Sequence, residues 1–169
     1  MRHVFHRHDL IWVLAFPVYQ IIGTIRHEAS HALVVLAEGG TVLKFVFWPT
    51  WHERFYWGYV QWSGSASWLV SAAPYLIDLL TFAVFYLICT KVAMRRHWVW
   101  VNVYMIGLIS PLVNSGYRYI SNFFRTGDLT SVMTSVPPRI VHAYFILTLF
   151  AYGTALLWIQ YRKDRAVTT

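Results

Sequence analysis

Charged residues are scarce in this sequence. Asp, Glu, Lys and Arg make up only 12% of its 169 residues, whereas a soluble globular domain carries roughly 25%. Hydrophobic residues account for 57%, so there are too few charges to cover the surface of an ordinary soluble domain. The composition excludes that class and predicts a membrane-embedded protein.

Cysteine and acidic residues are also few. Cys89 is the single cysteine, which excludes an intramolecular disulfide. The chain has seven acidic residues and fourteen Lys and Arg residues, which gives a net charge of +7. The basic residues are scattered near the ends of apolar runs instead of forming one stripe, which is typical of membrane anchors and not of nucleic-acid binding. We therefore expect no nucleic-acid partner.

Long apolar runs predict four transmembrane helices, at about residues 10–38, 66–90, 98–114 and 139–160. Each is close to the length that crosses a hydrocarbon core of about 30 Å as a helix. Pro17 is expected to kink the first helix, and Gly39 and Gly40 are expected to end it. The prediction is an all-α, multi-pass membrane protein with a single membrane-embedded domain over residues 1–169.

Residues 41–62 have a different pattern. Side chains alternate with a period of two in two runs separated by a segment that contains Pro49, and tryptophans are frequent in and near these runs. This pattern predicts a short β-hairpin after the first helix, lying in the membrane interface, where tryptophan is enriched. The alternative is an aromatic-rich interfacial loop.

The first predicted span contains His27, Glu28 and His31 in the pattern His-Glu-x-x-His. Residues four apart share one face of a helix, so both imidazoles can bind one metal ion while the glutamate acts as a general base toward water. Ionisable groups in hydrocarbon are costly without partners. The pattern predicts a zinc hydrolase site, and the alternative is a buried ion-pair network that includes Arg26.

A catalytic zinc ion usually has three protein ligands and one open position. Asp128 is the preferred third ligand, because Gly127 before it permits a close backbone approach. Its alternative role is to cap a helix over residues 129–136. His142 and Asp78 are the other candidates, and either of these could instead orient an imidazole by hydrogen bonding.

These features resemble the site-2 protease family of intramembrane zinc metalloproteases, especially its small, minimal members. The resemblance rests on His27-Glu28-Ala29-Ser30-His31, on Gly39-Gly40 directly after that helix, on the β-rich segment 41–62 and on a later aspartate. In that family a Leu-Asp-Gly motif supplies the third ligand, whereas here Gly127 precedes Asp128 and Leu129 follows it. The resemblance implies proteolysis of a membrane-protein or membrane-peptide substrate within the lipid bilayer.

The expected chemistry is peptide hydrolysis with Zn²⁺ held by His27, His31 and Asp128, and with Glu28 moving the proton. Asn114 and Asn122 are candidate ligands of the substrate backbone; the alternative for each is an amide that is hydrogen-bonded inside the protein. The hairpin edge is expected to accept an unwound stretch of substrate as an added strand.

Two other functions fit parts of the sequence. One is a non-catalytic, zinc-binding membrane scaffold, and the other is an electron-transfer bundle whose haem is bound by His31 and His142. Two signals disagree on the orientation in the membrane, which is left open. Eight Lys and Arg residues lie on the side of the membrane that holds the termini and five lie on the other side, which places the termini in the cytoplasm. The family resemblance instead places the hairpin in the cytoplasm. The sequence does not indicate the oligomeric state.

Overall fold

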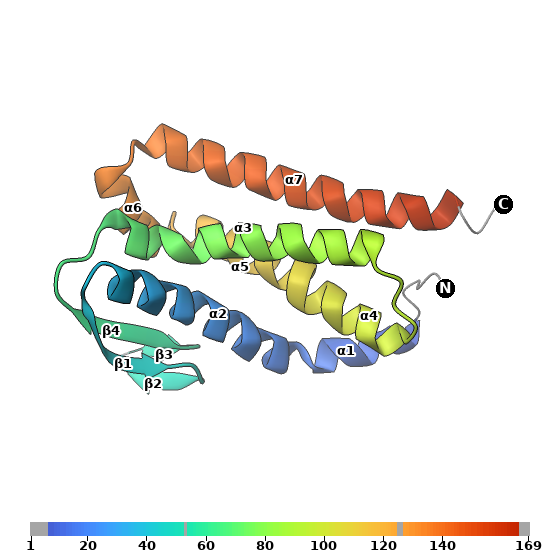
Figure 1. The fold of residues 1–169 in the computed structure, drawn as a ribbon, viewed down its shortest axis with the longest axis horizontal. Helices are drawn as coiled ribbons and strands as arrows, with labels where there is room; N and C mark the ends of the chain where they lie inside the picture. The colour runs from blue at the N-terminus through green and yellow to red at the C-terminus, as the bar shows by residue number, and fades with distance from the viewer. Residues whose placement is uncertain (1–6, 53, 125–126, 166–169) are drawn as a thin grey trace.

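The computed structural model describes residues 7–52, 54–124 and 127–165, and the remaining parts of the predicted domain 1–169 lie outside the described residues. The fold is mostly helical with a small antiparallel hairpin near one end (Figure 1). In chain order the elements are η1 (Arg7–Leu10), α1 (Ile11–Leu14), α2 (Phe16–Ala37), β1 (Thr41–Val46), β2 (Thr50–His52), β3 (Arg54–Tyr56), β4 (Tyr59–Ser63), α3 (Trp68–Lys91), α4 (His97–Tyr104), η2 (Met105–Ile109), α5 (Ser110–Ser121), α6 (Asp128–Ser135) and α7 (Pro138–Arg165).

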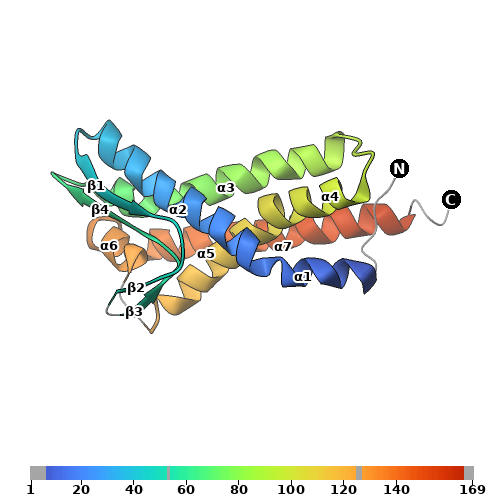
Figure 2. The same cartoon turned by 90° about the horizontal axis from the view of Figure 1, so that it is seen from below.

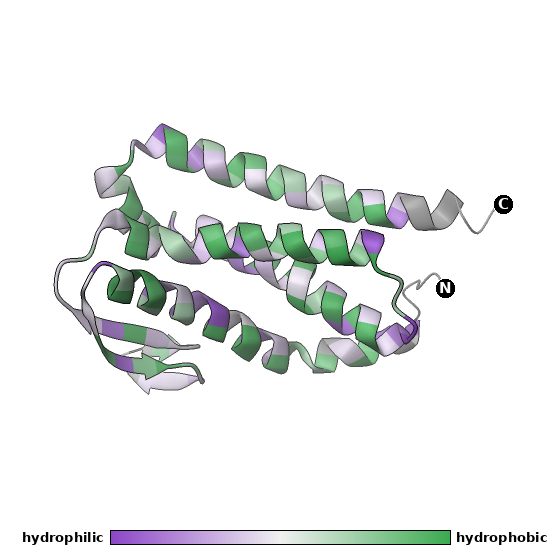
Figure 3. Ribbon diagram, in the orientation of Figure 1, coloured by the Kyte–Doolittle hydropathy of each residue, from purple (hydrophilic) through white to green (hydrophobic). Residues whose placement is uncertain are grey.

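Three helical segments of the described chain are long and apolar enough to cross a membrane, Trp68–Lys91, His97–Ser121 and Pro138–Tyr161. Figure 3 shows hydrophobic residues along α3, along α4 and along the coloured part of α7. The predicted first span, residues 10–38, is not among these three segments. Its centre carries the polar run from Arg26 to His31, which lowers its mean hydropathy. The structure therefore supports a possible multi-pass membrane protein, and the fourth span stays a prediction.

The first helix is broken close to the predicted kink. α1 ends at Leu14, and α2 begins at Phe16 with Pro17 in its first turn, where the missing proline N–H costs least. At the other end of α2, Gly39 adopts a φ of +80°, and the Gly40 N–H donates to the carbonyl of Val35 at 2.9 Å. Glycine adopts this left-handed conformation without strain, which confirms the expected helix end.

The third predicted span, residues 98–114, was too short. The helical segment starts at His97 and continues through a π-helical stretch, η2, into α5, which ends at Ser121. Pro111 follows η2 and has no N–H to donate, so the wider π-helical turn before it accommodates the missing backbone hydrogen bond. Among the seven residues beyond the predicted end, Ser115 contacts Asp78 of α3 and Tyr119 contacts His142 of α7.

Strand pairing extends through the Pro49-containing segment that separates the two predicted runs. β1 pairs with β4 from Thr41 opposite Ser63 to Val46 opposite Tyr59, and β2 pairs with β3 around residue 53. Pro49 lies between β1 and β2, so it interrupts one arm and does not form the turn. The register shifts between Val42 and Lys44, a bulge that lets the ribbon bend over α2.

Two clusters of buried side chains hold the helices together. One joins α3, α4 and α7 around Phe82, Tyr104 and Tyr152. The other joins α3, α6 and α7, with Leu129 and Phe145 at its centre. Figure 2 shows the hairpin, α6 and the end of α5 gathered at one end of the bundle, opposite η1 and the end of α7.

Candidate metal centre

The two histidines of the predicted motif lie side by side in α2. His27 and His31 are separated by one helical turn, both are buried, and their ring centroids are 5.0 Å apart. Glu28, next to His27, is also buried. Two imidazoles and a carboxylate therefore share the part of α2 that packs against α3 and the hairpin.

Asp128 joins the histidines from the first residue of α6. Its carboxylate Oδ2 lies 3.4 Å from Nε2 of His27 and 3.6 Å from Nε2 of His31. Gly127 occupies the cap position of α6, so Asp128 is free of the capping role. The three donor atoms lie within 4.8 Å of one another, and the group could hold a metal ion.

The spacing of these atoms suits an ion between them. A hydrogen bond from an imidazole nitrogen to a carboxylate oxygen spans about 2.7–3.2 Å, which is shorter than both distances. A tetrahedral ion with nitrogen and oxygen ligands at about 2.0–2.1 Å keeps neighbouring donors roughly 3.3–3.4 Å apart. The two distances to Asp128 thus come close to the spacing around such an ion, and three protein ligands would leave its fourth position open. The identity of the metal is not determined by this geometry.

The His31 ring is held in the tautomer that metal binding requires. Its Nδ1 lies 2.7 Å from the carbonyl oxygen of Val70 in α3. A carbonyl only accepts hydrogen bonds, so Nδ1 carries a proton, and Nε2 is the nitrogen turned toward Asp128. A carbonyl partner of this kind is what orients histidine ligands in metal sites.

The charge of Asp128 also suits a cation site. Burial alone would raise the pKa of its carboxyl group, but the adjacent imidazoles of His27 and His31 lower it more, so the pKa lies below its usual value. Asp128 is therefore ionised at neutral pH.

A buried polar network lies on the other side of His27. Nδ2 of Asn114 is 3.4 Å from Nδ1 of His27 and donates to Asp78 at 2.5 Å. Arg26 forms an ion pair with the other oxygen of Asp78 at 2.7 Å. Asp78, an alternative third ligand in the sequence analysis, is thus engaged by Arg26 and Asn114, outside the metal group.

The remaining predicted residues lie near the centre but not in it. His142 of α7 contacts the hydroxyl of Tyr119, 3.1 Å from its Nδ1, and stacks on Phe123. Asn122 accepts a hydrogen bond from Thr130 at 3.0 Å, which links the end of α5 to α6. A role in substrate binding for Asn114 and Asn122 stays a prediction.

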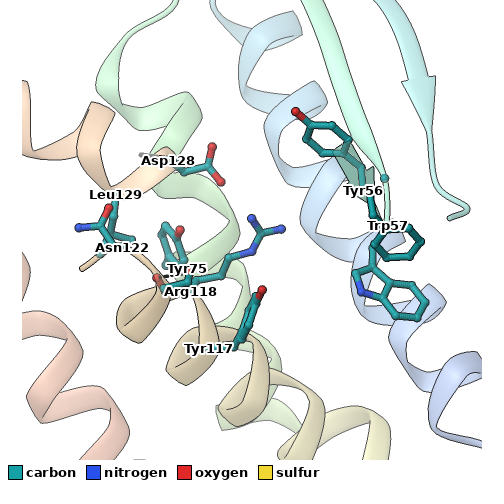
Figure 4. Close-up of a pocket in the computed structure, with 12 residues that line it drawn as sticks. Tyr56, Trp57, Tyr75, Tyr117, Arg118, Asn122, Asp128 and Leu129 are labelled. Atoms are coloured by element: carbon teal, nitrogen blue, oxygen red, sulfur yellow. Dashed lines mark hydrogen bonds between the residues drawn. The ribbon is translucent and has the colours of Figure 1, made fainter. Parts of the chain in front are cut away.

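A cavity of about 140 Å³ opens beside Asp128. It lies between the hairpin on one side and α5 and α6 on the other (Figure 4). The side chains and backbone that line it come from Phe55, Tyr56, Trp57, Gly58, Tyr75, Tyr117, Arg118, Ser121, Asn122, Gly127, Asp128 and Leu129. Asp128 is therefore the member of the metal group that borders an open space.

Arg118 points into this cavity in Figure 4 and is not among the site residues that the sequence predicts. A signal for it exists, because Asn114, Arg118 and Asn122 are spaced by four residues and so share one face of α5. The predicted span ended at residue 114, so Arg118 and Asn122 were not placed on the same helix as Asn114.

The hairpin packs directly on α2 beside Glu28. The backbone of Val60 in β4 lies close to the Glu28 carboxylate. A Cβ atom on Gly58 would lie 2.5 Å from Cγ2 of Thr24 and 2.6 Å from the carbonyl oxygen of Val46. Glycine at this position is what permits so close an approach.

Gly58→Ala is therefore expected to push β4 away from α2. Because the carbonyl of Val46 is backbone and cannot move aside cheaply, we expect the free energy of unfolding to fall by about 1–3 kcal/mol. The thermal unfolding midpoint in detergent measures the effect. Gly153→Ala is the control, because a Cβ there meets nothing within 4 Å; equal midpoints for the two variants would contradict the close packing.

Comparisons with family models, with curated proteins and with solved structures gave no match to this chain. The metal-binding group therefore rests on the geometry of His27, His31 and Asp128.

Proposed function

We propose that this protein is an intramembrane zinc metalloprotease, similar to the site-2 proteases, which hydrolyses a peptide bond in or near a transmembrane segment of another membrane protein. One observation carries the proposal: two buried imidazole nitrogens and a carboxylate oxygen converge at metal-ligand spacing, with Glu28 beside them. A structural ion pair alone would not account for the open cavity at the edge of this group.

In this proposal α1 and α2 form a fourth membrane span. Pairing of Arg26 with Asp78 neutralises the charge in the middle of α2, which lowers the cost of placing it in hydrocarbon. Leu33 and Leu36 are exposed on the outside of the helix, where they would face lipid. The hairpin lies in the interface, which agrees with the exposed side chains of Trp48 and Trp51.

Zinc is the proposed metal because of the donor set. Two histidines and one carboxylate with an open position are typical of catalytic zinc, whereas magnesium and calcium prefer all-oxygen sites. When bound, the zinc ion would polarise the scissile carbonyl and lower the pKa of the attacking water.

The residues of the chain then have separate roles. His31 is fixed by the Val70 carbonyl, so its ring would present Nε2 to the ion, and Nε2 of His27 lies beside the same carboxylate oxygen of Asp128. Glu28 takes the proton from the attacking water and passes it to the leaving amide nitrogen as the peptide C–N bond breaks. The buried position of Glu28 keeps bulk water from competing for that proton.

The proposed substrate is a helix that unwinds locally. Carbonyl groups of an intact helix are bonded within it and are not open to attack. The hairpin is a two-stranded ribbon with unpaired outer edges among the described residues, and such an edge can accept an extended segment as an additional strand. An unwound stretch held there would lie beside the cavity.

Removal and return of the metal tests the proposal. The purified protein is incubated with a set of membrane-spanning peptides in detergent micelles, and the products are identified by mass spectrometry. We expect cleavage by the zinc-loaded protein, its loss after chelation and its recovery when zinc is returned. Cleavage that persists in the chelated protein would contradict a metal-dependent reaction.

A further inference from the structure

Arg118 provides a positive charge in the cavity that the proposed hydrolysis does not use. It lies in the last turn of α5 and is partly buried. Figure 4 shows its guanidinium extending into the space between Asp128 and the hairpin residues Tyr56 and Trp57. Among the residues that line the cavity it is the one with a positive charge.

The guanidinium has no protein partner in the described part of the chain. Neither a hydrogen bond nor an ion pair joins the Arg118 side chain to residues 7–52, 54–124 or 127–165. Asp128, the nearest acidic group on the cavity wall, has Oδ2 directed at the two imidazoles. A partly buried guanidinium without a partner gains free energy when an anion binds it.

The surrounding charges favour an anion as well. Arg118 lines the same cavity as Asp128, one of the three candidate ligands, which places its charge close to the metal group. With a divalent ion bound, the ion and Arg118 together exceed the carboxylates of Asp128 and Glu28 by one positive charge. A planar guanidinium binds a carboxylate through two parallel hydrogen bonds, a geometry that lysine cannot match.

We propose that Arg118 binds a carboxylate of the substrate and makes the cavity selective for an acidic peptide. The carboxylate is that of an Asp or Glu side chain close to the scissile bond or that of a free C-terminus. This inference rests on the proposed function for its substrate, but it concerns binding and not bond cleavage. Arg118 is a specificity-determining residue in this account.

Peptide binding to the full chain tests the inference. The Glu28→Gln protein, loaded with zinc in detergent micelles, binds without turnover. The probes are fluorescein-labelled peptides with about 20 apolar residues and a central Gly-Xaa-Gly segment, in which Xaa is Glu, Gln or Lys. Each is made with a free and with an amidated C-terminus, and dissociation constants are measured by fluorescence anisotropy.

We expect a carboxylate to tighten binding about 10- to 100-fold, the usual contribution of a charge-assisted hydrogen bond. Tighter binding of the Glu probe than of the Gln probe indicates recognition of a side-chain carboxylate. Tighter binding of a probe with a free C-terminus than of its amidated form indicates recognition of the terminal carboxylate. Arg118→Gln should remove this preference, and Arg118→Glu should reverse it toward the Lys probe. Arg139→Gln is the control, because Arg139 is exposed at the start of α7 and does not line the cavity.

Three results would overturn the inference. They are the absence of binding to any probe, equal binding of the Glu, Gln and amidated probes, and an equal loss for all probes in Arg118→Gln. The last result would assign Arg118 a structural role. Carboxylate selectivity in a protein that cleaves no peptide would support the binding site and contradict the protease function, so the two proposals fail separately.

Discussion

Replacing Glu28 by Gln is expected to leave the metal bound and to lower the cleavage rate about 10²- to 10⁴-fold, the usual contribution of a general base. Glutamine has nearly the same shape and can remain beside Val60, but it cannot accept the proton of the attacking water. Metal content is measured by mass spectrometry of the purified variant, and cleavage is measured on the peptide identified for the wild-type protein.

Glu38→Gln is the matched control. Glu38 caps the end of the same helix and is exposed, its carboxylate accepts hydrogen bonds from Ser67, and it is not part of the metal group. Its loss should leave cleavage within about twofold of wild type, because an exposed carboxylate away from the site takes no part in proton transfer. Unchanged cleavage in Glu28→Gln would rule out Glu28 as the general base.

His31→Ala is expected to remove the metal. The substitution deletes one of three ligands and leaves the carbonyl of Val70 without its partner. Loss of an outer hydrogen-bond partner already weakens metal binding about 10- to 100-fold, and loss of a ligand should exceed this. Zinc affinity is measured by competition with a chelator of known affinity.

His142→Ala distinguishes the ligand set from its main alternative. His142 was a candidate third ligand, and in the structure it contacts Tyr119. The variant should bind zinc as tightly as the wild type, while Asp128→Ala should lose the metal as His31→Ala does. The opposite result for the pair His142→Ala and Asp128→Ala would assign the third ligand to α7.

Much of the helical part of the fold follows from the sequence because its signals are local. Pro17 and Gly39 act on the backbone within one turn, and the break and the end of the first helix lie where these residues predict them. The predicted third span ended too early because hydropathy falls after Asn114, although the helix continues to Ser121. Polar residues continue a membrane helix when they face a cavity.

The candidate site could be predicted only in part. His27 and His31 are joined by one helical turn, so their spacing follows from the motif. The approach of Asp128 depends on how α6 packs between α3 and α7, which no local pattern encodes. The pairing of Arg26 with Asp78 also depends on how helices pack, because the two residues lie on different helices and far apart in sequence.

X-ray absorption spectroscopy of the zinc-loaded protein tests most directly whether His27, His31 and Asp128 bind one ion. The account predicts a first shell of four nitrogen and oxygen atoms at about 2.0–2.1 Å, with the outer-shell scattering of two imidazole rings. That imidazole scattering should decrease in His31→Ala if any metal remains. A shell of oxygen atoms alone, or a protein that binds no zinc, would contradict the account.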